Sequence, residues 1–440
     1  MELTSIPTAG PTGAFDIERA RRDTRGVANV AHLNNAGAAL PPTQVTDAVI
    51  AHLRREAEMG GYEAAEAASD QVERTYAAIA RLIGAGVDEI AVVENATRAW
   101  DMAFYGLDFG PGDRILTASA EYASNVIAFL QVARRTGATI EVIDNDESGQ
   151  LSVSDLRRRL SDGNGPVKLV AITHVPTQGG LVNPAEEVGA VTRDAGVPYL
   201  LDACQSIGQM PLDVERIKCD LLSATGRKFL RGPRGTGFLY VRRDFLEQVE
   251  PPFLDLHAAT WTAPDNYEIR PDARRFENWE TNYAAKIGLG VAVDYALAWG
   301  LESIQDRVTR LAARLREHLA RVPGVEVHDQ GRRLCGIATF SVDGVPAQAV
   351  QRRLREHGVN VSVSLVDYAR LDLPTRGLPD LVRASVHYYN TDDEIEQLIE
   401  ALPSSGSRRF ERSWRAPHAE SLVPDRCPGG RRRSRSLLSR

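Results

Sequence analysis

The sequence predicts an α/β protein, with a large domain built on a seven-stranded, mostly parallel sheet flanked by helices and a smaller α+β domain after it. Short apolar runs alternate with helix-like segments over the first 285 residues or so. Such continuous runs are typical of strands buried on both faces of a parallel sheet. The seven expected strands cover residues 89–93, 114–117, 140–143, 168–173, 199–202, 220–222 and 237–241.

Apolar residues at helical spacing predict the helices that flank these strands. The first helical stretch covers residues 44–83 and is broken near Gly60, and a long one begins at Tyr283. Shorter strands and helices after residue 335 indicate the smaller domain. The expected organisation is a flexible arm over residues 1–25, a large domain over 26–285, a small domain over 286–402 and a basic, disordered tail over 403–440.

Composition narrows the class of protein. The 440 residues are 43% hydrophobic and 25% charged, which is ordinary for a globular protein. The net charge is −7, yet the tail carries ten arginines and three acids, so the rest of the chain is strongly acidic. Nucleic acid is therefore not expected as its main partner, and the tail is interpreted as a solvated extension. The four cysteines have neither metal-type nor disulfide-framework spacing, and no apolar leader or span stands out, so we expect a cytoplasmic enzyme.

Lys228 is the most informative single residue. The chain has only four lysines against 48 arginines. Arginine replaces lysine wherever only positive charge is needed, but its guanidinium keeps its proton and forms no Schiff base. A lysine retained just before a glycine-rich turn is therefore a candidate nucleophilic amine. Taken alone, it also fits an ordinary surface lysine.

Three motifs accompany Lys228 along the chain. Residues 94–98 (ENATR) follow a predicted strand and begin a predicted helix, so their N–H groups and the Thr97 hydroxyl suit a phosphate. The same pattern also fits an ordinary helix cap with no ligand. Asp202 closes an apolar strand at the edge where ligands of parallel sheets bind. It is a candidate partner for a protonated ring nitrogen, or a helix N-cap. Around Lys228, the glycines of residues 225–237 permit tight turns, without the spacing of a P-loop.

An anion cradle, a strand-end aspartate and a lysine in this order fit one cofactor. Pyridoxal 5'-phosphate (PLP) needs a phosphate site, an acidic partner for its pyridinium nitrogen and a Schiff-base lysine. With these motifs, the chain resembles the class V aminotransferase family of fold type I PLP enzymes over roughly residues 31–402. That family includes cysteine desulfurases and isopenicillin-N epimerase-like proteins.

The resemblance implies a role for each cofactor residue. Lys228 would form the internal aldimine, Asp202 would pair with the pyridinium nitrogen, and Gln205 would hydrogen-bond the ring hydroxyl oxygen. Tyr122 stands where the family usually has a histidine stacked on the ring, and tyrosine is a poorer proton shuttle near neutral pH. The phosphate would be held by Ala96, Thr97, Thr225 and Arg227.

For the substrate, the resemblance implies a carboxylate grip by Arg383, whose guanidinium suits a carboxylate bidentately. The segment HLNNAGA (residues 32–38) is similar to one that lines the family's substrate site, which implicates Asn35 and Ala36. Family members are dimers with active sites at the interface, so a homodimer acting on an amino acid as its small-molecule substrate is expected. No metal is expected.

Departures from the family bear on the reaction. Residues 358–378 match the loop where desulfurases carry a nucleophilic cysteine, and they contain none, so persulfide-forming chemistry is disfavoured. Residues 275–282 (RFENWETN) differ from the desulfurase segment that reaches the partner subunit's phosphate, which leaves that contact open. Residues 56–65 and 232–235 are similar to a narrower branch with the ergothioneine-pathway C–S lyase and lincosamide-biosynthesis PLP enzymes.

These observations predict a β-eliminating C–S lyase acting on a cysteine S-conjugate or sulfoxide, with the freed Lys228 as the base that removes the Cα proton. An aminotransferase, epimerase or decarboxylating deaminase of secondary metabolism uses the same residues, so these reactions remain open. The alternative outside the enzymes is a scaffold protein that has the PLP fold but does not catalyse a reaction.

Overall fold

The computed structural model describes residues 15–403 and 438–439. Its large sheet has the order β16-β4-β3-β5-β6-β7-β8-β2. All seven expected strands are present, and the pair Leu438–Ser439 (β16) adds to the β4 edge. Within these residues, β8 alone runs against the other strands. The seven are β2 (Ile90–Val93), β3 (Arg114–Ala118), β4 (Thr139–Ile143), β5 (Val167–Thr173), β6 (Tyr199–Asp202), β7 (Leu221–Thr225) and β8 (Gly237–Val241).

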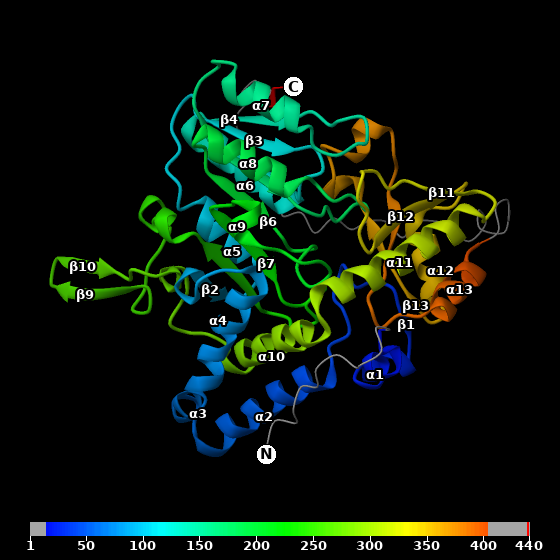
Figure 1. The fold of residues 1–440 in the computed structure, drawn as a ribbon, viewed down its shortest axis with the longest axis horizontal. Coiled ribbons are helices and arrows are strands. Elements are labelled where there is room, and N and C mark those ends of the chain that lie inside the picture. The colour runs from blue at the N-terminus through cyan, green and yellow to red at the C-terminus, as the bar shows by residue number, and fades with distance from the viewer. Residues whose placement is uncertain (1–14, 404–437, 440) are drawn as a thin grey trace, which may run out of the picture.

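Helices cover both faces of this sheet (Figure 1). Alternate residues of one strand point to opposite faces, so Ile90 and Val92 join one apolar core while Ala91 and Val93 join the other. The α/β prediction is thereby confirmed. The flanking helices are α2 (Thr43–Met59), α3 (Gly61–Ala67), α4 (Ser69–Ile83), α5 (Ala96–Phe104), α6 (Ala123–Thr136), α7 (Val153–Ser161), α8 (Ala185–Ala195), α9 (Val214–Ile217) and α10 (Tyr283–Trp299).

The expected long helix after Tyr283 is two helices. α10 ends at Gly300, whose φ of 78° belongs to the left-handed region, and α11 (Leu301–Ala320) leaves at 79° to it. Thirteen of the seventeen α10 residues are buried, so its apolar sequence reflects a core position. Within the described chain, no single helix combines the length and apolar composition needed to cross a bilayer.

The smaller domain is an antiparallel sheet with the order β11-β12-β15-β14, covered by helices. The segment before α2 is tied to the smaller domain, because β1 (Ala31–His32) pairs in parallel with β13 (Val359–Asn360). The remaining elements of the domain are β11 (Val325–Val327), β12 (Ile337–Val342), α12 (Ala347–Glu356), β14 (Ser362–Ser364), β15 (Leu381–Ser385) and α13 (Asp392–Ala401).

The N-terminal arm is more ordered than expected. It forms α1 (Ile17–Arg22) and a 3₁₀ turn (Arg25–Ala28). Phe15 stacks on Trp299 with ring centroids 4.7 Å apart, and Arg21 Nη1 donates to Glu394 Oε1 at 2.7 Å. The expectation of an unstructured arm is wrong from residue 15, because these partners lie hundreds of residues away and are invisible to local composition. Residues 1–14, and the tail apart from Pro403 and β16, lie outside the described residues.

One hairpin has no counterpart in the sequence predictions. β9 (Ala259–Ala263) and β10 (Asn266–Ile269) project from the body of the large domain (Figure 1). Its strands are short and mostly exposed, so they lack the continuous apolar run that marks the buried strands. Short 3₁₀ turns complete the fold at Val87–Glu89, Arg243–Gln248, Ala273–Phe276, Val366–Tyr368 and Leu373–Arg376.

Candidate active site

The carboxyl ends of the parallel strands bring the predicted residues together. Asp202 ends β6, Thr225 ends β7, and α5 and α6 begin just beyond β2 and β3. Between them lies a cavity of about 210 Å³. It is lined by Asn95, Ala96, Thr97, Tyr122, Thr173, Val175, Thr177, Asp202, Cys204, Gln205, Arg227 and Lys228. Seven of the predicted site residues therefore share one cavity, as the topology of the sheet requires.

Lys228 is buried, with 8% of its surface exposed. Within residues 15–403 and 438–439, its ammonium group has no hydrogen-bond or ion-pair partner. Burial lowers the pKa of Lys228, and the nearby Arg227 and Arg383 charges act in the same direction, against Cys204 and Asp202. A lowered pKa increases the neutral fraction of the amine, which is the nucleophilic and basic form.

Asp202 belongs to a buried polar network that the sequence analysis missed. Its Oδ2 accepts from Asn125 Nδ2 at 3.2 Å, and its Oδ1 accepts from the backbone N–H of Cys204 at 2.9 Å. Asn125 also donates to Glu121 Oε1 at 2.9 Å, so it bridges two carboxyl groups. Asp202 is thus held by an amide and a turn, and it caps no helix. The signal available in the sequence was Glu121 itself, an acid just past an apolar strand.

Glu121 is held by five donors. Its oxygens accept from Thr117 Oγ1 at 3.0 Å, from the backbone N–H groups of Tyr122 and Thr173, from Asn125 and from the Thr173 hydroxyl. Burial raises the pKa of Glu121 to about 7, with the Asp202 charge acting in the same direction. Glu121 thereby fixes the strand ends of β3 and β5 behind the cavity.

The cradle at the start of α5 depends on close backbone approach. Asn95 caps the helix by accepting from the Arg98 N–H at 2.9 Å, so the helix-cap reading is correct and coexists with a cavity lined by Ala96 and Thr97. Gly237 of β8 makes the approach possible. A Cβ there would lie 2.6 Å from the Asn95 carbonyl carbon and 2.8 Å from the Ala96 nitrogen. This packing places the start of α5 at the wall of the cavity, and the N–H groups at a helix start are suited to a phosphate.

Replacing Gly237 with alanine is expected to displace the start of α5. The three nearest atoms, which include the Ala224 oxygen at 2.7 Å, are all backbone, so relief requires movement of the cradle or of β7, and overpacking of this kind costs about 1–3 kcal/mol. Titration of the apoprotein with PLP should show weaker binding. Gly61→Ala is the matched control, since nothing lies within 4 Å of its added Cβ. Equal PLP affinity of the Gly237 variant and the wild type would contradict the role of the cradle.

Arg383, on β15 of the small domain, contacts the wall of the cavity through Thr177. Its Nη1 donates to the Thr177 backbone oxygen at 3.2 Å and to the Thr177 hydroxyl, and its Nη2 donates to Asn34 Oδ1 at 3.4 Å. Its Nε is buried without a partner, and no carboxylate within the described chain forms an ion pair with it. Burial lowers the pKa of Arg383 to about 10. A buried cation without a counter-ion is suited to an anionic ligand.

The remaining predicted residues separate into two groups. The Ala36 carbonyl accepts from Gln205 Nε2 at 3.0 Å, and Thr225 Oγ1 accepts from Arg227 Nη1 at 3.0 Å, so both adjoin the cavity. Asn35 does not reach it, because its amide donates to the Ser385 and His32 carbonyls and its oxygen accepts from Tyr389. The neighbouring Asn34 contacts Arg383 instead.

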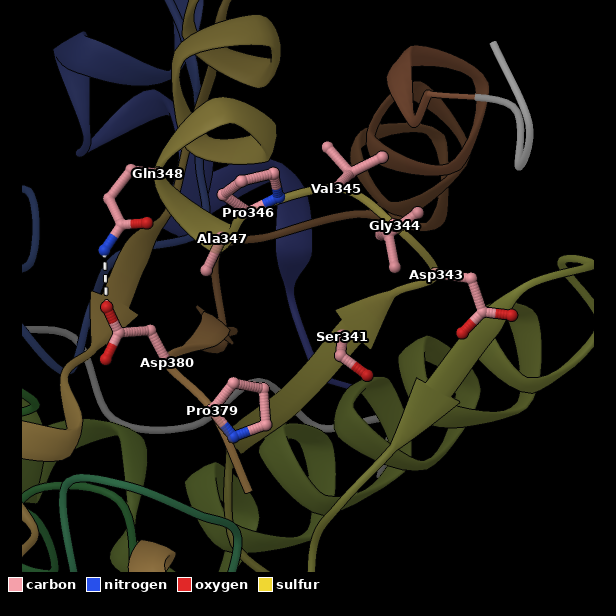
Figure 2. A pocket seen from close by; sticks show the side chains of 10 residues that line it. Ser341, Asp343, Gly344, Val345, Pro346, Ala347, Gln348, Pro379 and Asp380 are labelled. Atoms are coloured by element: carbon pink, nitrogen blue, oxygen red, sulfur yellow. Dashed lines mark hydrogen bonds between the residues drawn. The ribbon is translucent and has the colours of Figure 1, made fainter. Parts of the chain in front are cut away.

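Another cavity of about 640 Å³ opens in the small domain between β12, α12 and the segment before β15 (Figure 2). None of the predicted site residues lines it. Three of its four polar side chains are paired, since Gln348 Nε2 donates to Asp380 Oδ2 at 2.6 Å and Ser341 Oγ lies 2.8 Å from His328 Nε2. The smaller cavity at the strand ends is therefore the better candidate for chemistry.

The cofactor fits the smaller cavity. PLP requires a lysine, a carboxylate for its ring nitrogen and phosphate donors, and Lys228, Asp202 and the start of α5 line one space. The buried Gln205 Oε1 has no partner, which leaves this side chain available to a ligand. Cys204, which was not predicted, also lines the cavity, and burial raises the pKa of its thiol well above the usual range.

Comparisons with known proteins agree with this fit. Residues 31–398 match the family model for class V aminotransferases. The chain is 32% identical to a probable cysteine desulfurase of Xylella fastidiosa, over 90% of this chain and 97% of that protein. An apo cysteine desulfurase of Thermococcus onnurineus superposes with a TM-score of 0.81 at 27% identity, covering 88% and 97% of the two chains. A cystine C–S lyase in complex with its reaction product, cysteine persulfide, superposes with a TM-score of 0.77 at 25% identity, covering 86% of this chain and 98% of that chain.

The match to the family model spans both domains and includes Lys228, Asp202 and Arg383. The chain belongs to the class V aminotransferase family, and it is a PLP-dependent enzyme that acts on amino acids.

Proposed function

We propose that this enzyme is a β-eliminating C–S lyase that acts on a cysteine S-conjugate or sulfoxide. The observation that carries the proposal is a cavity lined by Asp202 and by a buried lysine with a lowered pKa, whose lining residue Thr177 contacts a buried arginine that has no counter-ion within the described chain. An α-amino acid brings the carboxylate that Arg383 lacks, and its Cα–H needs a base such as Lys228.

The missing loop cysteine favours elimination over sulfur transfer to the protein. Residues 358–378 approach the site, since Ser364 Oγ donates to the Thr177 carbonyl at 3.4 Å, but they contain no thiol. Cys335 is 2% exposed, and burial raises the pKa of its thiol to about 12, so it suits a structural role. Cys204 lines the cavity, but its raised thiol pKa keeps it protonated and weakly nucleophilic.

The chain's own groups have distinct tasks in such a reaction. When bound, PLP supplies an electron-poor ring that stabilises negative charge at the substrate Cα. Asp202 would hold the ring nitrogen protonated, and Ala96, Thr97, Thr225 and Arg227 would hold the phosphate. Arg383, fixed by Thr177 and Asn34, would bind the substrate carboxylate. Tyr122 would cover one face of the ring.

Lys228 would accept the Cα proton while the electron pair of the Cα–H bond expels the sulfur group from Cβ. The sulfur leaves as a thiolate from an S-conjugate, or as a sulfenate from a sulfoxide, and takes up a proton, and the remaining enamine is hydrolysed. The balance is one substrate and one water giving one pyruvate, one ammonium ion and one thiol, or one sulfenic acid where the substrate is a sulfoxide. Neither an oxidant nor an amino acceptor is consumed.

Product analysis distinguishes this reaction from its competitors. Purified holoenzyme would be incubated with S-alkyl and S-aryl cysteines and their sulfoxides, with and without an α-keto acid. Pyruvate and a sulfur-containing product formed without the keto acid support the lyase. Turnover only with the keto acid identifies an aminotransferase, whereas racemised substrate or carbon dioxide identifies an epimerase or decarboxylase, and each of these results contradicts the proposal. The non-catalytic reading predicts no turnover with any of them.

We also propose a homodimer with the active site near its interface. Support comes from large apolar side chains that are exposed on the hairpin β9–β10 and its neighbouring loops: Phe253, Leu256, Trp261, Tyr267 and Trp279. This surface adjoins the phosphate cradle, because the Arg98 guanidinium lies 3.9 Å from the centre of the Phe253 ring. Light scattering on the eluting holoenzyme should give twice the chain mass. A monomer at micromolar concentration contradicts a dimer.

A further inference from the structure

The loop that carries Lys228 is held by residues outside the cavity. Because the Lys228 ammonium has no hydrogen-bond partner in the described chain, the position of its side chain depends on the backbone of residues 226–231. That backbone turns tightly, with the Arg231 N–H donating to the Lys228 carbonyl at 2.9 Å. Arg231 adopts φ of 60°, in the left-handed region that favours glycine. A residue remains in this conformation only where the surrounding structure fixes it.

The Arg231 side chain supplies part of that constraint. It is 1% exposed, and its guanidinium donates to the Leu40 carbonyl at 2.8 Å, to Tyr388 Oη at 2.6 Å and to Thr24 Oγ1. The ring centre of Tyr389 lies 4.6 Å from the guanidinium carbon. Within the described residues, no carboxylate forms an ion pair with Arg231. A buried cation satisfied only by neutral groups is sensitive to small displacements of any of them.

His387 holds the same loop from the small domain. Its Nδ1 accepts from the Tyr388 N–H at 2.9 Å, which leaves the proton on Nε2 to donate to the Phe229 carbonyl at 2.9 Å. Burial keeps the pKa of His387 well below its usual value, and the Arg231 charge acts in the same direction, so the ring is neutral. Opposite it, Gly208 leaves no space, since an added Cβ would lie 2.5 Å from the Phe229 carbonyl carbon.

These contacts connect the two groups that must meet at the substrate. Arg383 lies on β15, and His387 and Tyr388 form the turn that directly follows this strand. The turn contacts the backbone of Phe229 and the side chain of Arg231, which follow Lys228 in the sequence by one and three residues. The site that binds the carboxylate and the loop that presents the base are therefore joined through one set of buried hydrogen bonds.

We propose that Arg231 and His387 are positioning residues that lock the Lys228 loop to the small-domain turn and so align the Lys228 amine with a substrate held by Arg383. This inference rests on the proposed roles of Lys228 and Arg383. Neither residue lines the cavity, and both act through the backbone of residues 228–231.

The test compares Arg231→Lys, His387→Phe and His387→Gln with a matched control. Arg114→Lys is that control, because Arg114 is also a buried arginine (2% exposed) and is paired with Glu141 and Asp162. It is the first residue of β3, so it lies at the amino ends of the parallel strands, whereas the cavity lies at their carboxyl ends. Three quantities would be measured on each holoenzyme: thermal stability, the pH midpoint of the cofactor absorbance band, and kcat and KM with the substrate found in the product screen.

If these residues position Lys228, Arg231→Lys and His387→Phe should shift the pH midpoint of the cofactor absorbance band. Both variants should also lower kcat by about 10- to 100-fold and change KM much less, because small misplacements of a catalytic group have effects of this size. His387→Gln keeps a donor toward Phe229 and should restore most of kcat. Arg114→Lys should lower thermal stability without moving the pH midpoint.

An unchanged pH midpoint and kcat in Arg231→Lys and His387→Phe, measured below their melting temperatures, would overturn the proposal. If His387→Phe is insoluble, the proposal is tested by Arg231→Lys and His387→Gln, each compared with Arg114→Lys. The pH titration needs no substrate, so it reports on the loop even where the proposed lyase reaction is absent.

Discussion

Replacing Lys228 with arginine should abolish turnover while leaving the fold intact. Arginine keeps the positive charge, but its guanidinium neither bonds to the cofactor aldehyde nor accepts the Cα proton. Loss of the general base alone accounts for about 10²- to 10⁴-fold in rate, and loss of the covalent cofactor linkage adds to it. Steady-state kinetics and the absorbance spectrum of the purified variant measure both effects.

Lys218→Arg is the matched control for this variant. Lys218 is exposed and ends helix α9, so arginine should serve there equally well and activity should stay at the wild-type level. Wild-type activity in the Lys228 variant would mean that another group is the base.

Replacing Asp202 with asparagine should lower kcat by about 10²- to 10³-fold, in the range found for removal of one electrostatic partner of a transition state. The amide has nearly the shape of the carboxylate, so the contacts with Asn125 and the Cys204 N–H are only partly disturbed. It lacks the negative charge that would keep the cofactor ring nitrogen protonated. The expected signature is a large loss of kcat with folding and PLP content largely retained.

The control removes a carboxylate elsewhere in the same domain. Asp213 caps α9 through the N–H groups of Glu215 and Arg216, and asparagine is an equally good cap. Asp213→Asn should therefore keep both stability and activity. A normal kcat in Asp202→Asn would remove Asp202 from its proposed role.

The sequence alone was sufficient to predict the strands of the large sheet and the site residues at the ends of those strands. Buried parallel strands are continuous apolar runs, and the residues that close them must meet at one edge, so Asp202 and Lys228 could be placed together from chain order. The class V family motifs added Arg383, which comes from the other domain. These predictions depend on local pattern and on the topology of the sheet.

What was missed depends on contacts between distant segments. The Glu121–Asn125–Asp202 network links the segment after β3, the first turn of α6 and the end of β6, and only the folded sheet places Asp202 within hydrogen-bond distance of Asn125. Asn34 and Asn35 are neighbours of the same type, and the pairing of Asn35 with Ser385 decides which of them reaches Arg383. The bend at Gly300 follows a helical pattern that continues on both sides, so periodicity alone did not reveal it.

Borohydride reduction of the holoenzyme, followed by peptide mass spectrometry, tests the central assignment most directly. Reduction makes the bond between cofactor and lysine permanent, so the modified peptide identifies the lysine. We expect loss of the cofactor absorbance band and a pyridoxyl-phosphate mass on the peptide that contains Lys228. The same mass on Lys168, Lys218 or Lys286, or on no lysine, would contradict it.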